Sequence, residues 1–389
     1  MADRMPSSNV PPLRRLAIVG ASARAAAYSA IRAGYEVVIC DLFADADLRV
    51  LGVEVSEADD YPNDFLGWLV EQSCDGWLYT GGLENFPALV DRMASCKKLL
   101  GNTGDQLSKA RSPTALAKLF PKNFPPTLAT SRGLPTDGSW LAKSYCGAGG
   151  SGVRVHTDSG STQAPFYQKR IDGKQSSATF VANGKQATLL GVTEQLIGEP
   201  WTGADEFQYC GSITGLELSS STLQLVERIG QTLAMEFGLQ GIFGIDFILE
   251  DEQIWLLEVN PRWPASLELL EQAGQFSGIA LHVAACWEEE LPGESFLFPS
   301  EEILGKAILF TPSDICISKK FTSDCLTNRG TIEVPQIADI PNFGTIIPAG
   351  RPVCTVFATG ENWAEVRGDL QGKIKRPFEG ISTASQLNG

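Results

Sequence analysis

Apolar and polar residues follow one another in a regular order along the first hundred positions. Residues 13–20 form a short apolar stretch typical of a strand, residues 21–33 a helix, and residues 35–40 a second strand that ends at Asp41. Helices over residues 58–72 and 87–94 and a strand over residues 76–79 continue this order. A strand, a helix and a parallel strand form the repeating unit of α/β folds, so this region predicts a parallel sheet covered by helices.

After residue 105 the pattern changes to shorter strands punctuated by glycine and proline. A helix over residues 107–119 is interrupted at Ser112-Pro113, because proline cannot continue a helix through its own position. The apolar stripe of residues 223–237 predicts one long amphipathic helix that packs on a sheet. Strands are predicted over residues 140–143, 153–155, 178–183, 186–195, 242–249 and 254–259. Further short strands and a helix over residues 363–374 are predicted within residues 303–389.

These changes divide the chain into five segments and predict the fold class, which is α/β followed by α+β. We expect a disordered tail (1–12), an N-terminal α/β domain (13–105), a small lobe (106–190), a large lobe (191–299) and a β-rich C-terminal portion (300–389).

Composition narrows the class of protein. The 389 residues are 43% hydrophobic and 20% charged, typical of a soluble globular chain with two or three domains. The net charge of −15, without a basic stripe, argues against a nucleic-acid partner. Nine scattered cysteines favour a reducing, cytoplasmic location, and only two histidines disfavour a zinc site. No long apolar run or signal-peptide pattern occurs, so no membrane association is expected.

The stretch GIFGIDFILEDEQIWLLEVNPR at residues 241–262 carries the strongest candidate chemistry. It reads as a hairpin in which Glu258 and Asn260 share one face and Asp246 lies opposite them. Two carboxylates and an amide oxygen suit Mg²⁺, and Arg262 would lie beside the metal as an anion-binding group. The alternative is a surface hairpin with solvated acids. It suits Asp246 and Glu258 poorly, because an unpaired charge inside an apolar strand is costly.

A glycine-rich stretch, SYCGAGGSG at residues 144–152, lies between two predicted strands. Its backbone N–H groups can surround phosphate, and Lys143 precedes it as a cation for the same anion. No GK[ST] follows, so the stretch is not a Walker motif, and a flexible β-turn is the alternative.

Two turns near the N-terminus lie at the carboxyl ends of parallel strands, where α/β proteins collect ligands. Ser22 and Arg24 follow the first strand, and Gly82, Glu84 and Asn85 follow the strand at residues 76–79. We expect these five residues to contact substrate, with Glu84 facing an amine; a plain turn with a solvated glutamate is the alternative. The turn GASARAAA lacks the second and third glycines of a dinucleotide-binding motif, which disfavours a nicotinamide cofactor.

The order of these motifs resembles the ATP-grasp superfamily over roughly residues 13–290, most specifically in the EVNPR sequence at residues 258–262. The resemblance implies that ATP lies between the two lobes. Arg262 and Lys143 would then be catalytic, and Arg262 would also contact substrate. In the same reading, Lys143 and the glycines Gly147, Gly149, Gly150 and Gly152 contact the nucleotide, and Asp246, Glu258 and Asn260 hold one or two Mg²⁺, or Mn²⁺ in its place.

Residues 166–173 resemble the family's connection between lobes, and imply nucleotide contacts from Gln168, Lys169 and Ile171. Many relatives have glutamate where Lys169 stands. The family's first phosphate lysine also has no direct match, and Arg111 or Lys109 is the expected substitute.

The resemblance implies an ADP-forming ligase that joins a small carboxylate to a small amine through an acyl phosphate, for example by adding glutamate to a one-carbon cofactor precursor. A homodimer is common among relatives. A bicarbonate-using carboxylase and a non-catalytic MgATP-binding regulator are the alternatives. A nicotinamide oxidoreductase is the third alternative and the least favoured.

Overall fold

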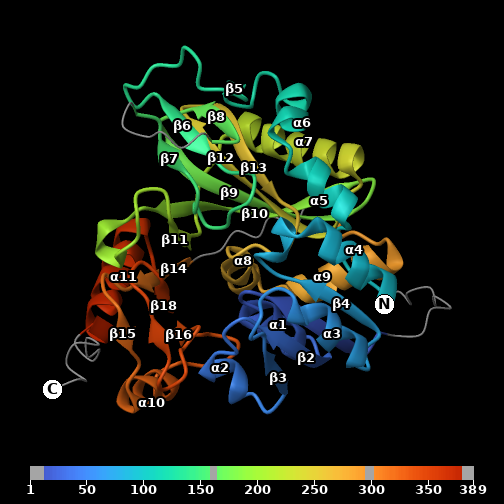
Figure 1. Cartoon of the computed structure of the whole chain (residues 1–389), viewed down its shortest axis with the longest axis vertical. Coiled ribbons are helices and arrows are strands. Elements are labelled where there is room, and N and C mark those ends of the chain that lie inside the picture. Colours follow the sequence, from blue (N-terminus) through green and yellow to red (C-terminus); the bar gives the residue numbers. More distant parts are fainter. Residues whose placement is uncertain (1–12, 158–163, 294–301, 379–389) are drawn as a thin grey trace.

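The computed structural model describes residues 13–157, 164–293 and 302–378. The predicted tail at residues 1–12 therefore lies outside the described residues, as do the last residues of the expected C-terminal portion. Figure 1 shows a parallel α/β unit, a small sheet at the opposite end of the molecule, and a large sheet that runs between them into the C-terminal portion. The predicted combination of α/β and α+β architecture is confirmed.

The N-terminal unit is a four-stranded parallel sheet in the order β3-β2-β1-β4. Residues 16–19 are fully buried, because a parallel sheet covered on both faces needs continuous apolar strands. Its elements are β1 (Arg15–Gly20), α1 (Arg24–Arg32), β2 (Glu36–Asp41), α2 (Ala46–Arg49), β3 (Glu54–Glu57), α3 (Asp64–Glu71), β4 (Gly76–Tyr79), η1 (Leu83–Asn85) and α4 (Pro87–Cys96).

The helix predicted over residues 58–72 is shorter than expected, because α3 begins only at Asp64. Pro62 precedes it, and proline disfavours helical backbone at the residue before it. The Asp64 carboxylate instead accepts the Asp60 N–H at 2.8 Å, which ties the preceding turn to the helix start.

The predicted break at Ser112-Pro113 is confirmed. Helix α5 (Gly104–Ala110) ends before it and α6 (Pro113–Leu119) begins after it, with the Ser112 hydroxyl capping the new helix at Ala115 N–H. A small four-stranded sheet follows in the order β5-β8-β6-β7. Its strands are β5 (Thr127–Leu128), β6 (Trp140–Lys143), β7 (Arg154–Val155) and β8 (Phe166–Lys169).

The large sheet has eight strands in the order β13-β12-β9-β10-β11-β14-β18-β16. The chain changes sheets between Lys169 and Lys174, so the lobe boundary expected at residue 190 falls inside a strand of the large sheet. The predicted antiparallel pair around Gly184 is present. The elements here are β9 (Lys174–Asn183), β10 (Ala187–Ile197), η2 (Pro200–Thr202), β11 (Tyr209–Ile213), α7 (Ser220–Phe237), β12 (Gln240–Glu250), β13 (Gln253–Asn260), α8 (Leu267–Gly274), α9 (Gly278–Val283) and η3 (Ala284–Glu288).

The two faces of the large sheet differ in character. Alternate residues such as Phe180, Phe243 and Phe247 are fully buried in a core with α7, which confirms that helix as packing structure. On the other face the intervening residues are mixed. Asp246 and Ser177 are polar and are direct partners in the β12–β9 register, whereas Val181 and Ile242 pack in a second core with the N-terminal unit. The polar part of this face is thus available for chemistry, and the apolar residues on both faces hold the strands in place.

The C-terminal portion extends the large sheet, because β14 pairs with β11 and β18 pairs with β14, and its strands β15 and β17 form a separate two-stranded sheet. Two helices accompany its strands, one of them at the position predicted for residues 363–374. The elements are β14 (Ile303–Phe310), β15 (Ile315–Cys316), α10 (Lys319–Thr327), β16 (Ile337–Ala338), β17 (Ile346–Ile347), β18 (Pro352–Gly360) and α11 (Trp363–Phe378). Among the described residues, no helix has both the length and the apolar character needed to cross a bilayer.

A buried charge network joins the N-terminal unit to the rest of the chain. The Arg24 guanidinium, on α1, donates to Glu268 of α8 at 2.6 Å and to Asp339 at 2.9 Å, and Lys306 of β14 donates to the same Glu268. Burial alone would raise the pKa of Glu268, but the charges of Arg24 and Lys306 and the hydrogen bonds from both lower it to about 2. The network therefore holds three segments of the chain together.

We expect Glu268→Gln to lower the free energy of unfolding by about 3 kcal/mol. The substitution removes the buried counter-charge of Lys306 and one of the carboxylates to which Arg24 donates. The stabilisation from Glu268 is complete above its usual pKa of 4.5 and is lost as the pH falls toward about 2. The free energies of unfolding of the wild type and the variant, measured with denaturant, should therefore differ most near pH 7 and converge in acid. A constant difference from pH 7 to pH 3 would contradict this assignment.

Candidate active site

The β12–β13 hairpin brings the predicted metal residues together. Its register pairs Asp246 directly with Glu258 and Gly244 with Asn260, and a bulge follows Asp246. Asp246 and Asn260 are half-buried and Glu258 is exposed at the edge of the sheet. Loss of solvent around the Asp246 carboxyl and the adjacent charge of Glu258 raise the pKa of Asp246 well above its usual value. Two carboxylates in this arrangement repel each other unless a proton or a cation lies between them.

The amide of Asn260 is oriented differently from the expectation. Its Nδ2 donates to Asp246 Oδ2 at 2.9 Å, and its Oδ1 accepts from Arg262 Nη2 at 3.0 Å, so the oxygen faces the guanidinium. Gln195 of β10 donates to the other Asp246 oxygen at 2.9 Å. Within the described residues, no three side chains of His, Cys, Asp and Glu gather as a metal site. The donor set therefore fits a cation that takes Asp246 and Glu258 and completes its shell from phosphate and water, as Mg²⁺ does.

Arg262 is held in one position by three acceptors. Its Nε donates to Glu84 Oε1 at 3.0 Å, its Nη1 to the Trp263 carbonyl and its Nη2 to Asn260. Glu84 lies on η1 of the N-terminal unit and is 2% exposed. The structure thus joins two motifs 178 residues apart, and Glu84 contacts Arg262 in the place where we expected it to face an amine.

Lys143, at the end of β6, points toward the same region from the small sheet. Its Nζ donates to Gln168 Oε1 at 2.9 Å. Burial lowers the pKa of Lys143, and the charges of Glu258 and Asp246 partly offset this effect. Gln168 is buried and bonded to Lys143 and Thr127, and Lys169 is exposed. Of the three predicted nucleotide residues at the end of the small sheet, Gln168 therefore acts here as a partner of Lys143.

The glycine-rich loop is docked at both ends. Gly147 donates its N–H to Asn85 Oδ1 at 3.2 Å, and the Gly149 carbonyl accepts from Tyr209 N–H at 3.0 Å. Gly149, Gly150 and Gly152 have φ values of +58°, +83° and +87°, which glycine adopts without strain. A Cβ on Gly150 would stand 1.8 Å from the Phe207 carbonyl oxygen, so the loop packs against the start of β11.

We expect Gly150→Ala to weaken MgADP binding about tenfold, because the added methyl group must displace the loop. Gly133→Ala is a matched control, since Gly133 has a φ of +78° and open space around it. Isothermal titration calorimetry measures MgADP affinity in the two variants. Both carry backbone strain at a positive φ, and only Gly150→Ala also displaces the loop. Equal affinities in both variants would show that the loop does not contact the nucleotide.

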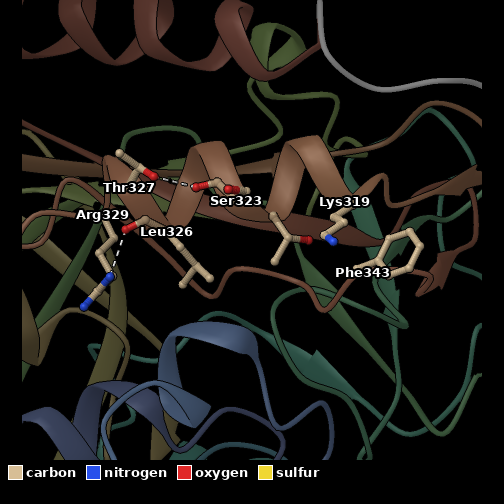
Figure 2. A pocket seen from close by; sticks show the side chains of 7 residues that line it. Lys319, Ser323, Leu326, Thr327, Arg329 and Phe343 are labelled. Carbon is tan, nitrogen blue, oxygen red and sulfur yellow. Dashed lines mark hydrogen bonds between the residues drawn. The ribbon is translucent and has the colours of Figure 1, made fainter.

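A cavity of about 70 Å³ lies between the loop, the end of β6 and the hairpin. Six of the predicted residues line it, namely Arg111, Lys143, Gly147, Gly149, Gly150 and Glu258. Arg111 rather than Lys109 is therefore at the site, and the Lys109 ammonium instead pairs with Asp105 on the surface. A second, more open cavity of about 400 Å³ lies on α10 beside Phe343, and none of the predicted site residues lines it (Figure 2).

Ile171 follows β8 and is half-buried, and the other remaining predicted residues lie at the N-terminal unit. Ser22 is exposed at the start of α1, and Arg24 is engaged in the charge network described above. Gln195 and Tyr209 were not predicted. Glu194 lies between Thr193 and Gln195, so no apolar alternation singles out Gln195, and the contact between Tyr209 and the glycine loop has no signal in the local sequence.

Comparison with known proteins agrees with this geometry. Residues 108–266 match a family model described as an ATP-grasp domain. An uncharacterized protein of Methanocaldococcus jannaschii is 26% identical over 227 residues, which cover 56% of this chain and 50% of that protein. The chain thus spans about half the length of this curated relative.

Two solved structures have the same fold. The L-amino acid ligase of Bacillus licheniformis superposes with a TM-score of 0.66 at 14% identity, over 96% of this chain and 98% of that one. The N5-carboxyaminoimidazole synthetase of Staphylococcus aureus, complexed with ADP, gives 0.65 at 14% identity, over 93% and 97%. Residues 108–266 are therefore an ATP-grasp domain, and the chain has the fold of the ATP-grasp superfamily.

Proposed function

We propose that the protein is an ATP-dependent ligase that joins a small carboxylate to a small amine and releases ADP and phosphate. One observation carries the proposal. A single cavity is lined by two cationic side chains, Arg111 and Lys143, by the glycine-rich loop, and by Glu258 of the acidic hairpin. Two cations, the backbone N–H groups of a glycine-rich loop and a hairpin carboxylate are the groups that a nucleoside triphosphate and its metal require.

The residues have separate tasks in this proposal. Lys143, Arg111 and the loop N–H groups bind the phosphates, and the docked loop excludes water. Asp246 and Glu258 would hold Mg²⁺, which when bound neutralises charge on the phosphate oxygens. Arg262 orients the substrate carboxylate and stabilises the charge that develops on the transferred phosphoryl group.

The reaction then follows from ordinary acyl-transfer chemistry. A carboxylate oxygen of the substrate attacks the γ-phosphorus, the bond to the bridging oxygen of ADP breaks, and an acyl phosphate results. The amine nitrogen attacks the acyl carbon, phosphate leaves, and the amine proton passes to phosphate or solvent. Little side-chain acid–base catalysis is needed, which agrees with the scarcity of histidine.

A carboxylase is the second candidate. It would use bicarbonate as the acid, and its support is the likeness to N5-carboxyaminoimidazole synthetase, which extends over 93% of the chain including the C-terminal strands. The likeness to the L-amino acid ligase is of the same quality and supports the amide-forming candidate. The two candidates share the acidic hairpin and the nucleotide cavity and differ only in the acid.

Nucleotide product analysis distinguishes them. Purified protein is incubated with MgATP, pooled carboxylates and pooled amines, with each pool omitted in turn and bicarbonate tested separately. We expect ADP and phosphate only when both pools are present. Dependence on bicarbonate would favour the carboxylase, AMP with pyrophosphate would overturn the mechanism, and ATP binding without turnover on broad pools would favour the regulator.

A further inference from the structure

Two side chains of the turn η1 contact different parts of the site. Glu84 pairs with Arg262, as described above, and its second carboxylate oxygen accepts the Gly82 N–H at 2.5 Å. The adjacent Asn85 faces the glycine-rich loop, where its Oδ1 accepts from Gly147 N–H. Consecutive residues of one short turn therefore hold the proposed catalytic arginine and the proposed lid.

Arg111 completes this arrangement on the loop side. Its Nη1 donates to the Glu84 carbonyl and to Asn85 Oδ1, both at 2.8 Å, and its Nη2 donates to the Gly147 carbonyl at 3.3 Å. The N–H of Gly147 is thus bonded to Asn85, which belongs to the turn, and its carbonyl is bonded to Arg111, which also donates to the turn. When the loop is docked, these bonds hold the turn on its loop side.

The turn is rigid enough to transmit this constraint. Leu83 is fully buried in the N-terminal core, and the backbone bonds Asn85 N–H to Gly82 and Phe86 N–H to Leu83 close the turn. Glu84 is 2% exposed, so its carboxylate has little freedom to find another partner. A shift of Asn85 therefore moves Glu84 and disturbs its buried ion pair with Arg262, because a closely packed turn transmits strain.

We propose that η1 couples docking of the glycine-rich loop to the placement of Arg262, with Asn85, Arg111 and Glu84 as positioning residues. The inference rests on the proposed function for the role it gives Arg262. Its consequence is that Arg262 is in place only when the loop covers the nucleotide. The phosphorylated intermediate is then stabilised only in a site from which water is excluded.

The test changes one end of the turn and measures the other. Glu84→Gln and Arg262→Ala each break the ion pair, and the hydrogen bonds of both side chains lead to Gly82, Asn260, Trp263 and each other rather than to residues 144–152. Because coupling is reciprocal, both variants should loosen the loop. Hydrogen exchange measured by mass spectrometry should show amides of residues 144–152 exchanging at least about fivefold faster in each, the low end of typical site-to-site coupling.

Controls separate coupling from general damage. Glu268→Gln breaks a different buried ion pair, so it reports what global destabilisation does to the same peptides. The Glu84→Gln, Arg262→Ala double variant should be no looser at the loop than either single variant, because both remove the same link. Asn85→Asp, which keeps the acceptor for Gly147 and Arg111, should retain slow exchange where Asn85→Ala does not.

Unchanged loop exchange in both Glu84→Gln and Arg262→Ala, with faster exchange in Asn85→Ala, would overturn the coupling and leave Asn85 as a local anchor only. The measurement needs no turnover. A protein that shows the coupling but forms no ADP would contradict the proposed ligase and not this inference.

Discussion

Replacing Arg262 with alanine is expected to lower the rate of ADP formation about 10³-fold, the size of effect seen when a preorganised group that stabilises transition-state charge is removed. The guanidinium lies between Glu84 and Asn260, and Asn260 also bonds Asp246, so it stands beside the carboxylates that would hold the metal. MgADP affinity should fall far less than turnover, because Arg262 does not line the cavity proposed for the nucleotide and acts on it only through the coupled loop.

Steady-state ADP release, with any substrate pair found in the pooled assay, measures this effect. Arg262→Lys is the companion variant. It keeps the positive charge but lacks the planar group whose separate nitrogens donate to Glu84 and Asn260, so we expect a loss intermediate between wild type and alanine. Because Glu84 becomes a buried unpaired acid in Arg262→Ala, thermal unfolding must show that the variant is folded at the assay temperature. A folded Arg262→Ala variant with near-wild-type turnover would exclude Arg262 from catalysis.

Asp246→Asn is expected to reduce turnover by a similar factor of about 10³, through loss of the metal rather than of the nucleotide pocket. Asparagine has the shape of aspartate, so the strand pairing with Glu258 should persist. It lacks the negative charge, and it presents N–H donors to the amides of Gln195 and Asn260, which already donate to this position.

Titration of activity with Mg²⁺ and Mn²⁺ separates these causes. We expect the variant to need far more metal for half-maximal rate and to recover only part of the rate at saturation. Chelation by EDTA should abolish wild-type turnover. A variant with an unchanged metal requirement would show that Asp246 does not hold the cation.

The hairpin could be predicted from the sequence because strand alternation and a short turn leave few registers. Once residues 251–252 form the turn, Asp246 must lie near Glu258, and the observed pairing differs only by a bulge. The glycine-rich loop could also be predicted, since so many glycines weaken a strand and mark a turn or a close approach of the backbone.

Other parts of the site depend on contacts between distant segments, which no local pattern encodes. Arg24 lies at a strand end where ligands collect, yet Glu268 and Asp339 lie more than 240 residues away and occupy its guanidinium. Glu84 was predicted at a strand end where ligands collect, but its pairing with Arg262 depends on how the N-terminal unit docks on the hairpin.

The boundary expected at residue 190 between the small and large lobes likewise depends on contacts that the local sequence does not encode. Residues 174–183 have the pattern of a strand in either lobe, and only their pairing with both β10 and β12 assigns them to the large sheet. The orientation of the Asn260 amide likewise follows from the two neighbours that it bonds.

A crystal structure of the wild-type chain with a non-hydrolysable ATP analogue and Mn²⁺ tests the proposed site most directly. Anomalous scattering locates the metal independently of the nucleotide. We predict a Mn²⁺ peak bound by Asp246 and Glu258, with the triphosphate between Lys143 and the glycine-rich loop. Nucleotide bound instead at the carboxyl ends of the parallel strands beside Ser22, or in the cavity on α10, with no metal at Asp246, would contradict the account.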